Sequence, residues 1–180
     1  SALNHYLKDV AHCHLSWCGD QLALPSPPPA VPAKVRLITP HPYRVMFNYC
    51  TLSYSCAWWD WPRWERELDF LAMNGINAPL GVIGLEGVWY NTLTKCGFSD
   101  AEARGFLVGP AFGAWQWMTN IEGHGGPVSR AWIEHRVALG QRWLARAREL
   151  GMTPVRQGFS GYVPRLLQQK QPSASIASQP

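Results

Sequence analysis

The chain has 180 residues, of which 47% are apolar and 16% are charged. This balance is typical of a globular protein and excludes a disordered chain. The net charge is only +4 and no dense run of Lys or Arg occurs, so we expect no nucleic-acid partner. No apolar run approaches the roughly 18 residues that a membrane-spanning helix needs, so we expect no membrane partner either.

Five cysteines are present, which is an odd number. At least one of them is therefore free or pairs outside this chain, and the pairing stays open. No signal-peptide pattern is visible. Because the chain starts at Ser1, directly within an amphipathic pattern, we expect a missing N-terminal segment, and the absent signal says little about the compartment.

The first elements are short. Residues 2–10 have the pattern of the end of a helix. Residues 10–24 alternate as a strand does, with His12, His14 and Ser16 on one face.

This stretch contains four side chains of zinc-ligand types: His12, Cys13, His14 and Cys18. On a strand, Cys13 would point away from His12 and His14. The spacing matches no closed tetrahedral pattern, so we predict no metal site.

A proline-rich run, SPPPAVP, follows at residues 26–32. Proline removes backbone donors and stiffens the chain, so the run indicates a linker. We place the end of one domain at residues 1–25, the linker at 26–40 and a second domain at 41–180.

The second domain alternates short strands with helices. We predict strands at about 43–48, 78–83 and 153–157, and long helices at about 61–74 and 129–150. Between them, short helices are expected over 86–117 and a glycine-rich loop over 120–127. Such alternation indicates parallel strands joined by βαβ units. A (β/α)₈ barrel needs about 250 residues, so if the domain is a barrel it is incomplete.

Tryptophans gather at the start of this domain, where Trp58, Trp59, Trp61 and Trp64 fall within seven positions. A flat indole face packs well on the apolar face of a sugar ring, and its N–H can hold a hydroxyl. The cluster therefore suggests a carbohydrate site. Four tryptophans packed in a core are the alternative.

Longer motifs carry a family resemblance. They are the N-x-C-T-x-S-Y-S-x-x-W-W-D-W-x-R-W-E block at 48–65, the L-A-M-x-G-I-N stretch at 71–77, G-x-E at 84–86, GPAFGAW at 109–115, LGMTPV at 150–155 and G-x-V-P at 161–164. In order and spacing, the chain resembles the α-N-acetylglucosaminidases of the lysosomal type, and the match extends over nearly its whole length.

The resemblance implies an α/β chain: the end of a small α/β N-terminal domain, followed by the first βα units of a (β/α)₈ TIM barrel. It implies a retaining glycoside hydrolase that removes terminal α-linked N-acetylglucosamine, in animals chiefly from heparan sulfate. It further implies a glycan partner, no cofactor, and a lysosomal or secretory location. The oligomeric state stays open.

Retaining hydrolysis needs two carboxyl groups about 5 Å apart. In the family both glutamates lie on later barrel strands, and we predict no catalytic pair in this chain. Most of its carboxylates sit at helical spacing and suit solvated faces or caps: Glu65, Glu67, Asp69, Asp100, Glu102, Glu134 and Glu149. Glu86 differs, because it follows the second strand, where barrel sites form.

We predict five substrate-binding residues: Asn48, Cys50, Tyr54, Glu86 and Trp115. The first three lie just beyond the first strand, and the family's matching positions line the pocket of the terminal sugar. The alternatives are a buried thiol with a packed tyrosine, a carboxylate at a helix N-terminus for Glu86, and core packing for Trp115.

The chain departs from the family in places. Leu85 replaces the glutamine of G-Q-E, and Tyr162 replaces the histidine of G-H-V-P, so a pocket contact at Tyr162 is in doubt. We expect a chain that supplies part of a sugar pocket but is inactive by itself. The alternative is a non-catalytic carbohydrate-binding module or a truncated product without activity.

Overall fold

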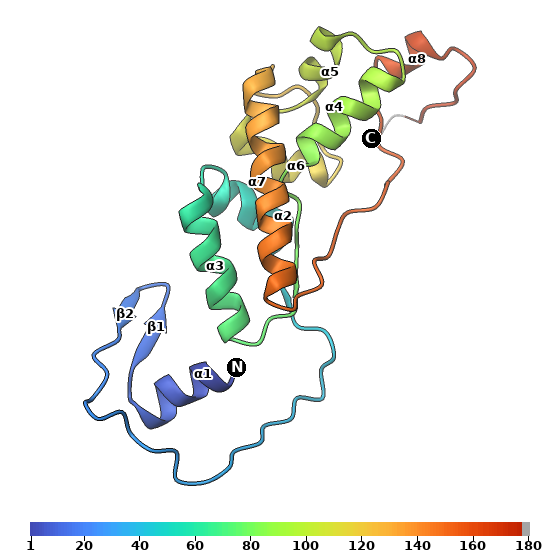
Figure 1. Cartoon of the computed structure of the whole chain (residues 1–180). Helices are drawn as coiled ribbons and strands as arrows, with labels where there is room; N and C mark the ends of the chain where they lie inside the picture. The colour runs from blue at the N-terminus through green and yellow to red at the C-terminus, as the bar shows by residue number, and fades with distance from the viewer. Residues whose placement is uncertain (178–180) are drawn as a thin grey trace. The chain divides into compact units, whose positions relative to one another are not determined.

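The structure is a computed structural model that describes residues 1–177 (Figure 1). The chain forms two compact units. The first combines residues 1–46, 60–81 and 142–155, and the second combines residues 47–59, 82–141 and those from 156 onward.

The first unit begins with α1 (Ala2–His5), which continues as a π-helical turn over Tyr6–Val10. A hairpin follows, in which β1 (His14–Ser16) pairs antiparallel with β2 (Gly19–Gln21). The prediction of one strand over 10–24 is therefore wrong. His12 adopts a left-handed φ of 53°, which separates the helical turn from β1, and Trp17 and Cys18 form the reversal between the strands.

Cys13 lies in a small core with Leu7 and Ala11, against which Met73 packs. His12 and His14 are exposed. The predicted linker at 26–32 belongs to a longer stretch, 22–44, that forms neither helix nor strand and appears in Figure 1 as an open loop.

Three short segments form the sheet of this unit. Strand β3 (Val45–Met46) pairs in parallel with β4 (Ala78–Pro79), and Leu80 makes a parallel bridge to Val155. The prediction of parallel pairing is confirmed, but the segments are shorter than expected. Pro79 contributes one reason, because it has no N–H to donate to the neighbouring segment.

Helix α3 (Trp61–Met73) forms as its local signals predict. The Asp60 carboxylate accepts from the Arg63 backbone N–H at 3.1 Å, and a proline occupies the first turn. The helix ends before Gly75, whose φ of +79° suits glycine. Its buried face includes Trp64, which is fully buried.

Trp143, from the later part of α7 (Arg130–Glu149), meets Trp64 edge to face with centroids 6.4 Å apart. A Cβ at Gly81 would lie 2.7 Å from the Trp143 ring, so only glycine fits there. Core packing thus accounts for Trp64. Trp58, by contrast, is 69% exposed.

The second unit consists of short helices, as predicted for 86–117. They are α2 (Tyr49–Thr51), a π-helical turn over Leu52–Cys56, α4 (Leu85–Lys95), α5 (Asp100–Phe106), a 3₁₀ turn over Pro110–Phe112, α6 (Gly113–Trp117), the first part of α7, and α8 (Leu167–Lys170). The predicted loop at 120–127 is a loop. Within residues 1–177, no helix is both long and apolar enough to cross a membrane.

Helices α4 and α7 approach closely in this unit. A Cβ at Gly87 would lie 2.1 Å from a methyl group of Val137, and one at Gly140 would lie 2.5 Å from the Ile83 carbonyl oxygen. The two glycines therefore set how near the helices come. This packing fixes the position of the first turn of α4, which carries Glu86.

Candidate functional site

Asn48 lies two residues beyond the end of β3 and caps α2. Its carboxamide oxygen accepts from the backbone N–H and from the hydroxyl of Thr51, both at 2.9 Å. These bonds fix the side chain and use its oxygen. The NH₂ group is thus the part of Asn48 that suits a ligand oxygen.

Cys50 and Tyr54 lie on the same short helical segment. Cys50 is a partly exposed free thiol, and Tyr54 is 75% exposed rather than packed away. The Tyr54 ring meets the Trp115 ring edge to face, with centroids 5.5 Å apart and planes at 78°. The structure therefore brings together two predicted residues that lie far apart in the sequence.

A hydrogen bond holds this pair in place. The Ser53 hydroxyl accepts from the Ala114 backbone N–H at 3.0 Å, so the residues that precede Tyr54 and Trp115 are joined directly. Ser53 was not among the residues predicted from the sequence. It lies in the motif beside Tyr54, but its role depends on the contact with α6, which the motif does not reveal.

Glu86 has other neighbours. One carboxylate oxygen accepts from the Gly84 N–H at 3.1 Å, and the other accepts from Nε of Arg136 at 3.2 Å. The Arg136 side chain is 9% exposed, and its guanidinium lies 5.6 Å from the centre of the Trp132 ring. The helix-terminus alternative thus describes Glu86 well, and its bonds do not join it to Asn48, Cys50 or Tyr54.

The other carboxylates take structural roles. Asp69 pairs with Arg146, Asp100 with Arg104 and Glu134 with Arg130. Glu102 bonds Lys170 and completes a capping box with Ser99; first Lys170 and then Ser99 lower the pKa of Glu102 to about 2. These contacts agree with the caps and helix faces predicted for them.

Glu67 is the exception among these carboxylates. It is 1% exposed, and it accepts from the Trp17 indole N–H at 3.0 Å and from Arg63 at 2.8 Å. The prediction of a solvated face is wrong for this residue. Because both carboxylate oxygens are bonded, Glu67 anchors the hairpin side chain to α3.

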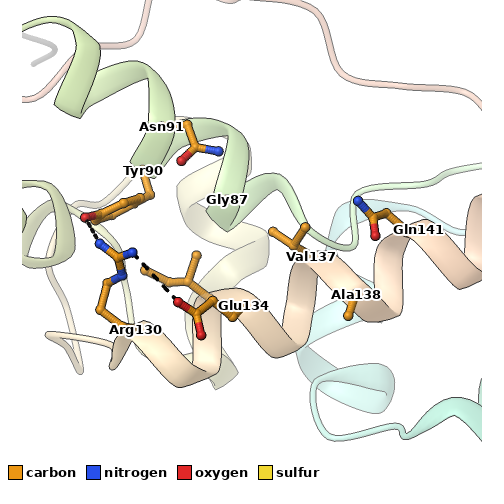
Figure 2. Close-up of a pocket in the computed structure, with 9 residues that line it drawn as sticks. Gly87, Tyr90, Asn91, Arg130, Glu134, Val137, Ala138 and Gln141 are labelled. Carbon is orange, nitrogen blue, oxygen red and sulfur yellow. Dashed lines mark hydrogen bonds and ion pairs between the residues drawn. The ribbon is translucent and has the colours of Figure 1, made fainter.

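A groove of about 340 Å³ runs between α4 and the first part of α7, and its lining includes none of the predicted site residues (Figure 2). The Arg130 guanidinium donates to the Tyr90 hydroxyl, lies 4.6 Å from its ring centre and pairs with Glu134 at 3.7 Å. Tyr90 in turn donates to Asp100 at 2.9 Å, and the pKa of Asp100 is lowered, first by Arg104 and then by Tyr90. The charges of the groove are therefore already compensated within the protein.

Tyr162 also proves structural. Its hydroxyl donates to the Ile121 carbonyl at 2.8 Å, which ties residue 162 to the glycine-rich loop. Burial, and then the negative charge of Glu122, raise the pKa of Tyr162 to about 12.

We therefore expect one tyrosine to ionise late. The tyrosinate absorbance of the chain should contain a component near pH 12 that Tyr162→Phe lacks. Between pH 10 and 12 the unfolded state loses this proton while the folded state keeps it, so the free energy of unfolding should fall as pH rises. Tyr162→Phe should lose less stability over that window; an equal loss in both proteins would contradict the assignment.

The family model described as the α-N-acetylglucosaminidase (NAGLU) tim-barrel domain matches residues 44–180, and the model of the N-terminal domain of the same family matches residues 1–32. The chain belongs to the α-N-acetylglucosaminidase family. The partial barrel is thereby supported, although the sheet is incomplete. The boundaries at residues 25 and 40 stay predictions.

Relatives of this family align over nearly all of the chain. Human α-N-acetylglucosaminidase is 43% identical over 176 residues, which cover 98% of this chain and 24% of the human protein. A family 89 glycoside hydrolase from Clostridium perfringens, solved with 2-acetamido-1,2-dideoxynojirmycin, superimposes with a TM-score of 0.95 at 40% identity over 98% of this chain and 20% of its own.

The same bacterial family 89 protein was also solved as a variant with two glutamates changed to glutamine, in complex with its substrate GlcNAc-α-1,4-galactose. That structure gives a TM-score of 0.96 at 40% identity over 99% of this chain and 20% of its own. The chain thus spans about a quarter or a fifth of the length of these relatives.

Proposed function

We propose that the chain is part of a retaining α-N-acetylglucosaminidase and supplies one wall of the pocket for the terminal N-acetylglucosamine. The contact between Tyr54 and Trp115 carries this proposal, because it places an exposed phenol and an indole beside the end of α2. The substrate of the bacterial relative, which ends in N-acetylglucosamine, supports the choice of sugar.

Each residue of this wall has a chemical role in the proposal. The Trp115 ring packs on the apolar face of the sugar, and the Tyr54 hydroxyl bonds a sugar hydroxyl. The Asn48 NH₂ group donates to a sugar oxygen, and the small Cys50 thiol packs beside the acetamide methyl. Glu86, held by Arg136, contributes a fixed carboxylate near the start of α4.

The remaining parts of the proposal rest on the family. The partner is a glycan with a terminal α-linked N-acetylglucosamine, in animals heparan sulfate, and the compartment is the lysosome or the secretory pathway. Hydrolysis by two carboxyl groups requires no cofactor. We assign no catalytic residue in this chain.

Sugar binding tests the proposal directly. In an NMR titration, methyl α-N-acetylglucosaminide should bind the chain, and Trp115→Ala should weaken binding by roughly three- to tenfold, because a stacking contact is lost. Trp58→Ala is the matched control, since Trp58 belongs to the same tryptophan block but contacts Trp132 instead. Equal losses in both variants, or none in Trp115→Ala, would argue against this wall.

A further inference from the structure

The glycine-rich loop holds His124 in a fixed position. The Gly109 N–H donates to the His124 carbonyl at 2.8 Å, and the Gly123 N–H donates to the Phe106 carbonyl at 2.9 Å. A Cβ at Gly109 would lie 2.3 Å from the Gly125 carbonyl oxygen, so the two backbones can approach only because Gly109 has no side chain. The loop therefore packs closely against the end of α5 and the turn before α6.

His124 stands at one end of a row of four rings. Its imidazole meets Phe112 edge to face, with centroids 4.5 Å apart. Phe112 lies 6.4 Å from Trp115, and Trp115 lies 5.5 Å from Tyr54. Both ends of the row, Tyr54 and His124, are exposed, while Phe112 and Trp115 are partly exposed. The row therefore continues the proposed sugar wall beyond Trp115.

We propose that Phe112 and His124 bind a second sugar residue, the one to which the terminal N-acetylglucosamine is linked. This inference rests on the function proposed above. One sugar ring packs on one aromatic platform, which Trp115 and Tyr54 supply for the terminal sugar. The next two side-chain rings of the row, those of Phe112 and His124, therefore lie beyond that sugar. The Phe112 ring contacts the C–H face of the second sugar, and an imidazole nitrogen of His124 hydrogen-bonds one of its hydroxyls.

Burial and rigidity favour this assignment over simple packing. A histidine that served only the core would be buried, whereas the His124 side chain faces solvent from a loop that backbone hydrogen bonds hold. A Cβ at Gly125 would lie 2.8 Å from the Phe112 ring, so the loop also braces this ring from one side. Both groups are thus fixed before a ligand arrives, which lowers the entropic cost of binding.

The test compares two sugars on the full chain. GlcNAc-α-1,4-galactose should bind about fivefold more tightly than methyl α-N-acetylglucosaminide, as expected for one added ring contact. His124→Ala should remove this preference and leave the affinity for the monosaccharide unchanged. Phe112→Leu should do the same. His135→Ala is the control, because His135 is also exposed and lies beside a tryptophan, but on α7.

The outcomes separate the two proposals. If the monosaccharide binds and His124→Ala keeps the full preference for the disaccharide, the second-sugar site is wrong and the proposed function stands. If neither sugar binds the wild-type chain, both the proposed function and the second-sugar site are wrong. The amide spectrum of each variant must match that of the wild type outside the loop; if His124→Ala fails this check, Phe112→Leu decides the outcome.

Discussion

The 180-residue chain should not hydrolyse an aryl α-N-acetylglucosaminide. Its rate should lie at least about 10²-fold below that of a full-length family member, because one missing carboxyl group alone removes a factor of this size. Retaining hydrolysis requires a nucleophile and an acid about 5 Å apart across the anomeric carbon.

Several of the carboxylates are committed to structural contacts. Asp69 and Asp100 are paired with arginines, Glu102 is part of a cap, and Glu67 is buried beneath Trp17. Glu86, which bonds Arg136, is a single carboxylate, and binding without preferential stabilisation of the transition state gives no acceleration. The wall formed by Tyr54 and Trp115 could therefore hold the sugar without cleaving it.

The hydrolysis rate is measured as release of the chromophore from a chromogenic aryl α-N-acetylglucosaminide at acidic and neutral pH. The bacterial family 89 hydrolase is the positive control. Turnover close to that control would overturn the assignment of no catalytic residue. Glu65, Glu86 and Glu122 would then be changed to glutamine in turn. Sugar binding without turnover is the result that both the proposed pocket wall and the carbohydrate-binding alternative predict, whereas absence of both would favour an inactive product.

Arg136→Met should lower the free energy of unfolding by about 3 kcal/mol, at the lower end of the effect of breaking a buried ion pair. The substitution keeps most of the side-chain volume but leaves the Glu86 carboxylate, only 14% exposed, without its cation. It also removes the contact between the guanidinium and the Trp132 ring.

The change in the free energy of unfolding is measured by urea denaturation, with tryptophan fluorescence as the signal. Arg148→Met is the matched control, since Arg148 is exposed in the last turn of the same helix and should cost no more than about 1 kcal/mol. Adding Glu86→Gln to Arg136→Met should recover part of the loss, because a neutral amide oxygen can still accept from Gly84. No recovery would mean that packing of Arg136, rather than the ion pair, supplies the stability.

Features that depend on neighbouring residues could be predicted from the amino-acid sequence. Asp60 and Gly75 set the two ends of α3, and the alternation of short strands with helices determined that the strands run parallel. The motif block at 48–65 was long enough to indicate the family. Caps, stops and motifs act over a few residues, so their effect can be read without knowing what packs against them.

Contacts between residues that are distant in the sequence could not be predicted in this way. Periodicity alone suggested one strand where β1 and β2 form a hairpin, and it placed Glu67 in solvent, whereas Trp17 covers it. The partner of Glu86, Arg136, comes from α7, and the ring that faces Tyr54 comes from α6. Such contacts depend on how closely two backbones approach, as Gly87 and Gly109 show, and that distance is a property of the packed chain rather than of any local pattern.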